Sequence, residues 1–214
     1  AHPNVGGIVG TYWSIWIVDT AIDVDHPFFG PDSDSDGIAD RIVFQQDFAE
    51  GDFDASDSDN HGSNVASIAA ASVGSSIGMA PGANIIALKV VPDGMNQLAS
   101  PAAIEQALQW VVGNVQSYNI ASINMSFTDD GNYLAPTTDP AGYGISDELA
   151  ALVGMDVIVV SSAGNLYDIF TSTQGVGYPA ADPNSLAVSA TSDATVGSIT
   201  SPRARSSATP PDLD

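Results

Sequence analysis

Short apolar runs alternate along this chain with segments in which apolar residues recur every three to four positions. The runs favour buried β-strands, since they are brief, contain many β-branched residues and end at turn-forming residues. We expect strands at residues 14–18, 42–44, 83–91, 121–127, 156–160 and 185–190. Residues 101–115 open with proline and place Ile104, Leu108, Val111 and Val115 on one side of a helix. Two further helices are expected at residues 63–72 and 147–154.

The order of these elements predicts an α/β fold. Strands that alternate with helices are typical of parallel sheets, and strands that are apolar throughout need cover on both faces. We therefore expect a doubly wound, mostly parallel sheet with helices on both faces, in one domain over residues 1–214. The tail, residues 202–214, is rich in Pro, Ser and Ala, and we expect the domain to be incomplete at this end.

The charge balance restricts the partners that this protein can have. The chain has 26 acidic residues against 4 lysines and arginines, a formal net charge of −22. Such a surface repels nucleic acids and anionic membranes, so we expect neither as a partner. The composition favours solubility, cation binding or a salt-rich environment. There are no cysteines, which excludes disulfides and thiolate metal sites. Residues 1–10 lack the features of a signal peptide, so we expect a mature form or a fragment.

Three polar residues follow or adjoin predicted strands and could form one site. Asp19, His61 and Asn165 each lie where a strand gives way to a loop or helix, and sites in open α/β sheets form at that edge. A carboxylate there can hold an imidazole in one tautomer, and an amide can donate to a developing oxyanion. Each residue alone is more often a cap or a turn residue.

The surrounding segments make the pattern specific. Six colinear segments carry it: 19–27 (DTAIDVDHP), 61–66 (HGSNVA), 78–83 (GMAPGA), 123–126 (INMS), 162–165 (SAGN) and 178–190 (YPAADPNSLAVSA). They resemble the Asp block, the His block, the G-x-A-P-x-A turn, the substrate strand, the oxyanion block and the late strand of subtilisin-like serine proteases (subtilases). The resemblance extends over residues 12–214.

The resemblance implies a serine endopeptidase domain that acts on polypeptides by Asp-His-Ser acyl transfer. Asp19 would orient His61, His61 would be the general base and later the general acid, and Asn165 would stabilise the oxyanion. Substrate would pair with Ser126, Phe127 and Thr128 as an added strand, and Ala163 and Gly164 would wall the P1 pocket. The family also implies export from the cell and, often, bound calcium.

The sequence also departs from the family pattern. Ala21, Asn64, Ser67 and Thr128 replace residues that are usually Gly, His, Gly and Gly, and no G-T-S-M-A block occurs in the 214 residues. We therefore expect this chain alone to be inactive, because losing that serine in subtilisin costs about 2 × 10⁶ in kcat. Ser75, Ser76 and Ser198 are interpreted as ordinary loop serines.

Two other classes of function compete with the protease. A non-catalytic pseudoprotease or calcium-binding interaction module would account for Asn64, Ser67 and Thr128. A dinucleotide-binding protein is disfavoured, because no G-x-G-x-x-G follows a predicted strand. Without the helix that follows the serine in subtilases, apolar sheet surface would stay exposed, so we also expect self-association.

An aspartate-rich loop forms a second candidate site. Residues 32–40 read DSDSDGIAD, in which Asp32, Asp34, Asp36 and Asp40 could converge around Ca²⁺ and Gly37 permits a sharp turn. The twelfth position of a full EF-hand loop is Val43 instead of Glu, and a solvated acidic loop is the equal alternative. A second acidic stretch, residues 52–59, is interpreted as plain surface.

Overall fold

The structure is a computed structural model that describes residues 10–94, 98–166, 169–171 and 173–190. Its strands are β1 (Ser14–Asp19), β2 (Ile42–Asp47), β3 (Ser72–Val73), β4 (Ser76–Ile77), β5 (Asn84–Lys89), β6 (Ile120–Met125), β7 (Ile158–Ser162) and β8 (Leu186–Val188). Its α-helices are α1 (His61–Ala70), α2 (Pro101–Asn114) and α3 (Ser146–Gly154), and two short 3-10 helices are η1 (Pro27–Phe29) and η2 (Pro140–Gly142).

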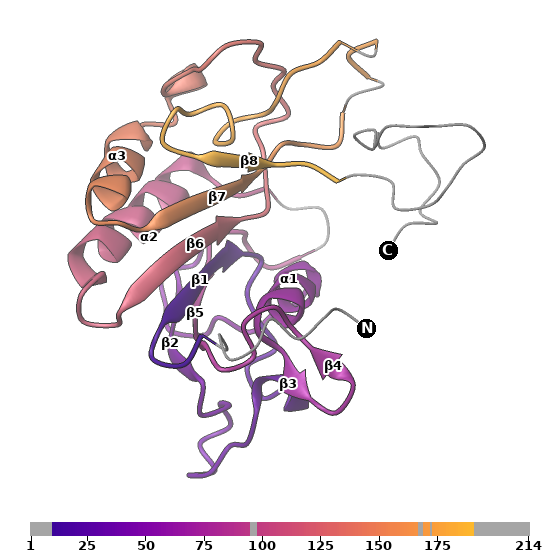
Figure 1. Cartoon of the computed structure of the whole chain (residues 1–214), viewed down its shortest axis with the longest axis vertical. Helices are drawn as coiled ribbons and strands as arrows, with labels where there is room; N and C mark the ends of the chain where they lie inside the picture. The colour runs from indigo at the N-terminus through magenta and orange to yellow at the C-terminus, as the bar shows by residue number, and fades with distance from the viewer. Residues whose placement is uncertain (1–9, 95–97, 167–168, 172, 191–214) are drawn as a thin grey trace.

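Six strands form one parallel sheet in the order β2-β5-β1-β6-β7-β8, and helices lie on both of its faces (Figure 1). This arrangement confirms the predicted doubly wound α/β fold. Strands β2 and β5 lie on one side of β1, and strands β6, β7 and β8 lie on the other. The chain therefore switches direction across the sheet at β1, and the carboxyl ends of β5, β1 and β6 meet at this switch point.

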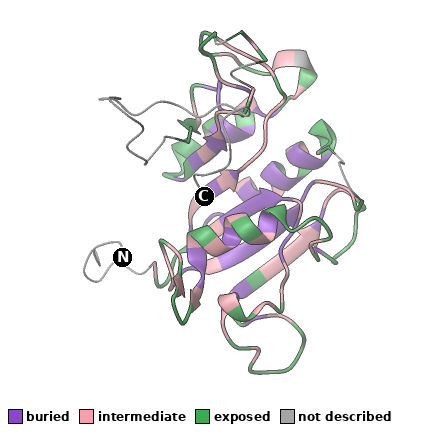
Figure 2. Cartoon of the chain, turned by 90° about the vertical axis from the view of Figure 1, so that its right-hand side faces the viewer, coloured by how far each residue is buried: buried purple, intermediate pink, exposed green. Residues whose placement is uncertain are grey.

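Side-chain alternation along β1 explains why its sequence is apolar throughout. Trp16 and Val18 pack into the larger core beneath α2 and α3, whereas Ile17 packs on the opposite face with Ala66 and Ala70 of α1. Strand positions alternate between faces, so a strand covered on both sides must be apolar at every position. Figure 2 shows these central strands as buried and the helices as exposed on their outer sides.

Most predicted elements are present, with shifted bounds. Helix α1 begins at His61 and ends at Ala70, two residues earlier at each end than predicted, and β7 is displaced toward Ser162. The predicted loop around Ser76 is wrong, because Ser76 lies in β4, which pairs with β3 as a two-residue hairpin. Such short strands leave no periodicity to detect in the sequence. Among the described residues, no helix is long and apolar enough to cross a membrane.

Both basic residues of the described segments are used inside the fold. The Arg41 guanidinium donates to the backbone carbonyls of Ala70, Pro81, Ala83 and Phe29, at 2.6–3.1 Å. Lys89 is 2% exposed and its Nζ contacts Asp47 at 2.7 Å, Asp93 at 2.9 Å and Glu50 at 3.2 Å. The described surface is therefore dominated by carboxylates, as the net charge predicts.

One part of the sheet keeps apolar side chains exposed. Val159 packs under α3, so Ile158 and Val160 point to the α1 side, and Leu186 pairs with Val160 in the register. On that face α1 contacts β1 and β5, whereas Ile158 and Leu186 are each 57% exposed. The edge of the sheet at β7 and β8 thus presents an apolar strip.

Candidate active site

The carboxyl ends of β1, β6 and β7 and the first turn of α1 surround the candidate site. Asp19 is the last residue of β1, His61 is the first of α1, and residues 126–128 and 163–165 follow β6 and β7 directly. Because parallel strands end at the same edge of a sheet, these segments come from distant parts of the sequence to one place.

Asp19 and His61 are in direct contact. His61 Nδ1 lies 2.6 Å from Asp19 Oδ1, and the backbone N–H of Thr20 donates to the same oxygen at 2.8 Å. The Asp19 carboxylate is 2% exposed, whereas the His61 side chain is half-exposed. The hydrogen bond to Asp19 raises the pKa of His61, against the opposing effect of burial, and the charges of Asp19, Asp59 and Asp57 add to the rise. The contact with Asp19 thus favours the protonated form of the His61 imidazole.

The start of α1 depends on a residue that the sequence interpretation missed. Asn60 has a left-handed backbone and makes no capping hydrogen bond; instead Asp57 accepts from the backbone N–H of Ser63 at 2.9 Å and of Asn60 at 2.9 Å. Burial alone would raise the pKa of Asp57, but these hydrogen bonds, together with those from the Ser63 hydroxyl and the Asp59 N–H, lower it. The interpretation of residues 52–59 as plain surface is therefore wrong for Asp57. An Asp four residues before His61 was the available signal.

A cleft of about 260 Å³ opens beside the pair. Asp19, Thr20 and His61 line one side, and Ser126, Phe127 and Thr128 line another. The Ser126 hydroxyl accepts a hydrogen bond from the Asn124 side chain at 2.8 Å. In the described part of the chain, no serine hydroxyl is hydrogen-bonded to the imidazole of His61. The cleft therefore joins the predicted acid–base pair to the predicted substrate strand, without a serine in the attacking position.

The other predicted site residues lie at the same sheet edge but do not line this cleft. Asn165 is exposed, and among the described residues it has no hydrogen-bond partner for its side chain. Ala163 is tied to the sheet, since its N–H donates to Val188 and its carbonyl accepts from Gly177. Gly164 has φ +99° and lies against Thr128, whose Cγ2 would be 3.6 Å from an added β-carbon. The Thr128 side chain thus occupies space beside the predicted P1 wall.

Ser75 and Ser76 belong to the β3–β4 hairpin or its turn and do not line the cleft, and Ser198 lies outside the described residues.

Ala21 shows why the family pattern has glycine at this position. Its φ is +122°, a conformation that a side chain disfavours, and its carbonyl oxygen faces the backbone of Gly62. The methyl group is buried against the α1 side of the sheet. The loop after Asp19 therefore carries backbone strain next to the Asp19–His61 pair.

We expect Ala21→Gly to stabilise the protein by about 1 kcal/mol, because it removes a strain of about 1–3 kcal/mol and loses one small buried methyl group. Urea unfolding followed by circular dichroism measures the change. Ala66→Gly, at a buried position in α1, is the matched control and should destabilise by about 1 kcal/mol or more. Equal destabilisation by both substitutions would contradict the assignment of strain to Ala21.

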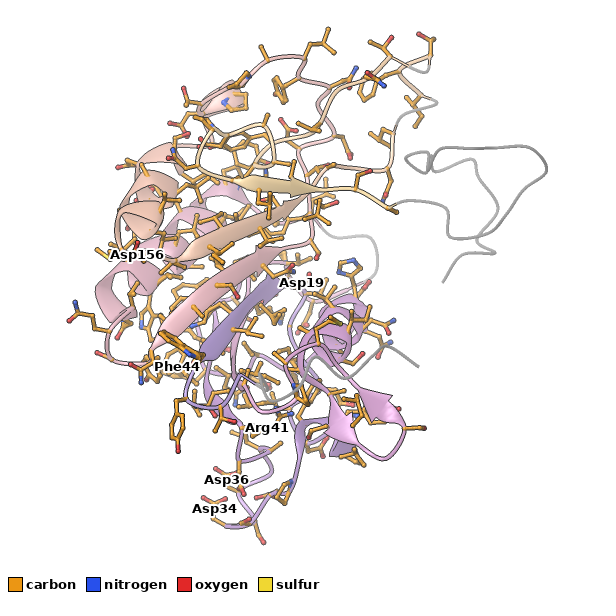
Figure 3. The ribbon with its side chains drawn as sticks, viewed as in Figure 1. Asp19, Asp34, Asp36, Arg41, Phe44 and Asp156 are labelled. Carbon is orange, nitrogen blue, oxygen red and sulfur yellow. The ribbon has the colours of Figure 1, made fainter. Side chains whose placement is uncertain are left out.

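The aspartate loop is separate from this cleft. Figure 3 shows Asp34 and Asp36 at the bottom of the view and Asp19 near its centre. Asp32, Asp34 and Asp40 each offer an oxygen within 4.8 Å of the others, and all three are exposed. Asp36 is not part of this group, and its Oδ1 accepts from the Ile38 N–H at 2.9 Å. Three of the four predicted carboxylates thus converge, and Asp36 lies outside this group.

Comparison with known proteins agrees with the geometry. The family model described as the subtilase family matches residues 10–213. The chain belongs to the subtilase family. Subtilisin E of Bacillus subtilis (strain 168) is 30% identical over 188 residues, which cover 86% of this chain and 42% of that protein. A thermophilic serine proteinase of Bacillus sp. (strain AK1) is 36% identical over 80 residues, 36% of this chain and 18% of that protein.

Solved subtilase structures share the fold. The S41 psychrophilic protease superposes with a TM-score of 0.71 and sphericase with 0.66, each at 24% identity over 92% of this chain and 59% of the other. The family model over residues 10–213 confirms the resemblance to subtilases that the sequence predicts. The chain spans less than half the length of Subtilisin E.

Proposed function

We propose that this chain supplies the acid–base and substrate-binding parts of a serine endopeptidase, and that the nucleophilic serine is not among its 214 residues. The observation that carries the proposal is the 2.6 Å contact between Asp19 Oδ1 and His61 Nδ1 at the mouth of the cleft. Family membership supports peptide-bond hydrolysis as the reaction and polypeptides as the substrates. Export from the cell is proposed on the same basis.

In this proposal His61 transfers the proton during formation of the acyl-enzyme. Its second ring nitrogen takes the serine proton as the hydroxyl attacks the peptide carbonyl, and then gives the proton to the leaving amine. Asp19 fixes the tautomer with the proton on Nδ1 and stabilises the imidazolium that forms. The raised pKa of His61 fits this task, because the protonated form is the one that Asp19 favours.

Substrate binding is assigned to the segment after β6. Ser126, Phe127 and Thr128 would pair with an extended peptide, and Ala163 and Gly164 would bound the P1 side chain. Asn165 is proposed as the oxyanion donor; being exposed, its amide must reach the carbonyl oxygen once substrate lies in the cleft.

A fusion of this chain at Asp214 to the serine-bearing part of Subtilisin E tests the function. We expect the fusion to hydrolyse a chromogenic peptide and the 214-residue chain to do so no faster than buffer. Asp19→Asn in the fusion should lower kcat by about 10⁴, through the wrong tautomer of His61. A folded fusion with no hydrolysis, or hydrolysis unaffected by Asp19→Asn, would contradict the assignment and favour a non-catalytic binding module.

We also propose that the loop of residues 32–40 binds Ca²⁺ through Asp32, Asp34 and Asp40. Carboxylate oxygens are the ligands that Ca²⁺ prefers, and it takes six to eight of them or of other oxygens. Hydrogen bonds from the Ser33 hydroxyl and N–H lower the pKa of Asp40, so it is ionised at neutral pH. When bound, the ion would offset the mutual repulsion of these carboxylates.

Calcium is expected to raise the thermal unfolding midpoint of the chain, because an ion that binds only the folded state stabilises it. Asp34→Asn should abolish most of the rise, whereas the matched control Asp54→Asn, in the other acidic stretch, should leave it intact. Differential scanning calorimetry with and without Ca²⁺ measures the effect. An unchanged midpoint in the parent chain, or an equal rise in Asp34→Asn, would refute the site.

We also expect the chain to self-associate through the exposed apolar strip at β7 and β8, which includes Ile158 and Leu186. Static light scattering of the 214-residue chain should give a mass above the 21.9 kDa of one copy. Ile158→Lys combined with Leu186→Lys should return it to the monomer, and Leu134→Lys, at an exposed loop position, is the control. A monomeric parent at high concentration would refute the expectation.

A further inference from the structure

The Asp57 carboxylate connects the two chain segments that carry Asp19 and His61. Its Oδ2 accepts from both the N–H and the hydroxyl of Ser63, at 2.9 and 2.5 Å. Its Oδ1 accepts from the Thr20 hydroxyl at 3.0 Å, besides the N–H groups of Asn60 and Asp59. One carboxylate therefore holds the first turn of α1 and the residue that follows Asp19.

Thr20 links Asp57 both to Asp19 and to the first turn of α1. Its hydroxyl donates to Asp57 and accepts from the N–H of Gly62 at 2.9 Å, while its own N–H donates to Asp19 Oδ1. The Ser63 hydroxyl likewise donates to Asp57 and accepts from the Asp23 N–H at 2.8 Å. Asp57 thus orients the hydroxyls of Thr20 and Ser63, and their hydrogen bonds join the loop after β1 to the first turn of α1.

The loop that carries Asp57 is itself anchored to buried charge. The Ser58 hydroxyl donates to Asp93 at 3.0 Å, and Asp93 pairs with Lys89, the last residue of β5. Lys89 lies beside Asp19 in the strand register. Through these contacts, residues 57–58 are connected to the end of β5 in the sheet.

We infer that Asp57 is a positioning residue that sets the contact between Asp19 and His61. It touches neither residue directly and acts through Thr20, Ser63 and the N–H groups at the start of α1. The inference rests on the proposed function for its catalytic meaning, but it concerns the geometry of the pair in this chain and can be tested without turnover.

The charges near His61 make it possible to separate a positioning role of Asp57 from the direct effect of its charge on the pKa of His61. Asp19 from β1 and Asp57 and Asp59 from the loop before α1 all raise the pKa of His61. Across the cleft lie Asp129, Asp130 and Tyr143. The charge of Asp59 contributes more to the rise than that of Asp57. Loss of charge alone would therefore make Asp59→Asn the more effective substitution.

The experiment is an NMR pH titration of the His61 imidazole in the 214-residue chain and its variants, with resonances assigned through His61→Gln among the three histidines. We expect Asp57→Asn to lower the pKa of His61 more than Asp59→Asn does, and to weaken or remove the low-field resonance of the Nδ1 proton shared with Asp19. Ser63→Ala leaves every charge in place and should also weaken that resonance. Circular dichroism verifies that each variant is folded.

An equal or smaller pKa change in Asp57→Asn than in Asp59→Asn, with the low-field resonance intact, would overturn the inference. Should Asp57→Asn fail to fold, Ser63→Ala decides: an unaltered resonance overturns the inference and a weakened one supports it. If the titration overturns the role of Asp57, the fusion can still hydrolyse peptides. If the fusion is inactive, the titration can still show that Asp57 positions His61, so the two claims are tested independently.

Discussion

Lys89→Met is expected to destabilise this protein by about 3–5 kcal/mol, the usual cost of removing one partner from a buried ion pair. The substitution keeps the volume of the side chain but leaves Asp47, which is 1% exposed, without its cation. Asp47 Oδ1 would still accept from the N–H groups of Ala49 and Glu50, but Oδ2 would lose its 2.7 Å contact. Urea unfolding at pH 7 measures the loss.

The pH dependence of this effect has a definite sign. Burial alone would raise the pKa of Asp47, but hydrogen bonds from Lys89, Glu50 and Ala49 hold it below the ordinary 3.8. A lowered carboxyl pKa stabilises the fold above the unfolded value and the stabilisation is lost as pH falls through the folded value. For Lys89 the neighbouring carboxylates outweigh burial and raise the pKa of the amine. Its contribution to the free energy of unfolding is therefore complete below pH 10.5 and is lost at higher pH. The difference between parent and variant should therefore be largest from about pH 5 to 10 and shrink toward pH 3.

The double variant Lys89→Met with Asp47→Asn is the control, because it removes both buried charges. It should recover part of the stability lost in Lys89→Met, as pairs replaced together often do. If Lys89→Met unfolds with the parent midpoint, or the double variant is as unstable as the sum of its parts, the buried pair does not hold this edge of the sheet.

Gly62→Ala is expected to cost about 3 kcal/mol or more and to separate Asp19 from His61. A β-carbon at Gly62 would lie 2.0 Å from the carbonyl oxygen of Ala21 and 3.1 Å from Asp19 Cβ. Neither contact is with the end of a flexible side chain, so the loop after β1 must move away from α1. The variant should lose the low-field Nδ1 resonance of His61 and unfold at lower urea concentration.

Gly113→Ala is the matched control in a helix. An added β-carbon there meets nothing within 4 Å, and alanine is the better helix former, so α2 should gain about 0.5–1 kcal/mol. Stability loss in Gly113→Ala of the same size as in Gly62→Ala would show that the close approach to Ala21 is not the cause.

Much of the sheet could be predicted because its central strands are covered on both faces. Strands such as β1 and β5 are therefore apolar at consecutive positions, which is the strongest signal a short segment can carry. The start of α1 was placed too late because its first turn, His61 and Gly62, contains no apolar residue and its cap is Asp57, outside the helix. The two-residue strands β3 and β4 have too little sequence to show a period.

The contact between Asp19 and His61 could be predicted from the sequence, but the hydrogen bonds that hold the two residues in place could not. Asp19 and His61 carry recognisable motifs, whereas the roles of Asp57, Thr20 and Lys89 follow from which backbone and side-chain groups meet in space. In the sequence, Asp57 differs from the exposed Asp54 and Asp59 only by its position four residues before His61. The same limit applies to Asp36, which the spacing grouped with Asp32, Asp34 and Asp40 but which lies outside their cluster.

Fluorophosphonate labelling followed by intact mass spectrometry tests the central claim most directly. The 214-residue chain should remain unlabelled, because no described serine is bonded to His61. The fusion with the serine-bearing part of Subtilisin E should take up one label at the added serine, and His61→Ala in the fusion should prevent it. A label on a serine of the 214-residue chain, or a folded fusion that is never labelled, would contradict the claim.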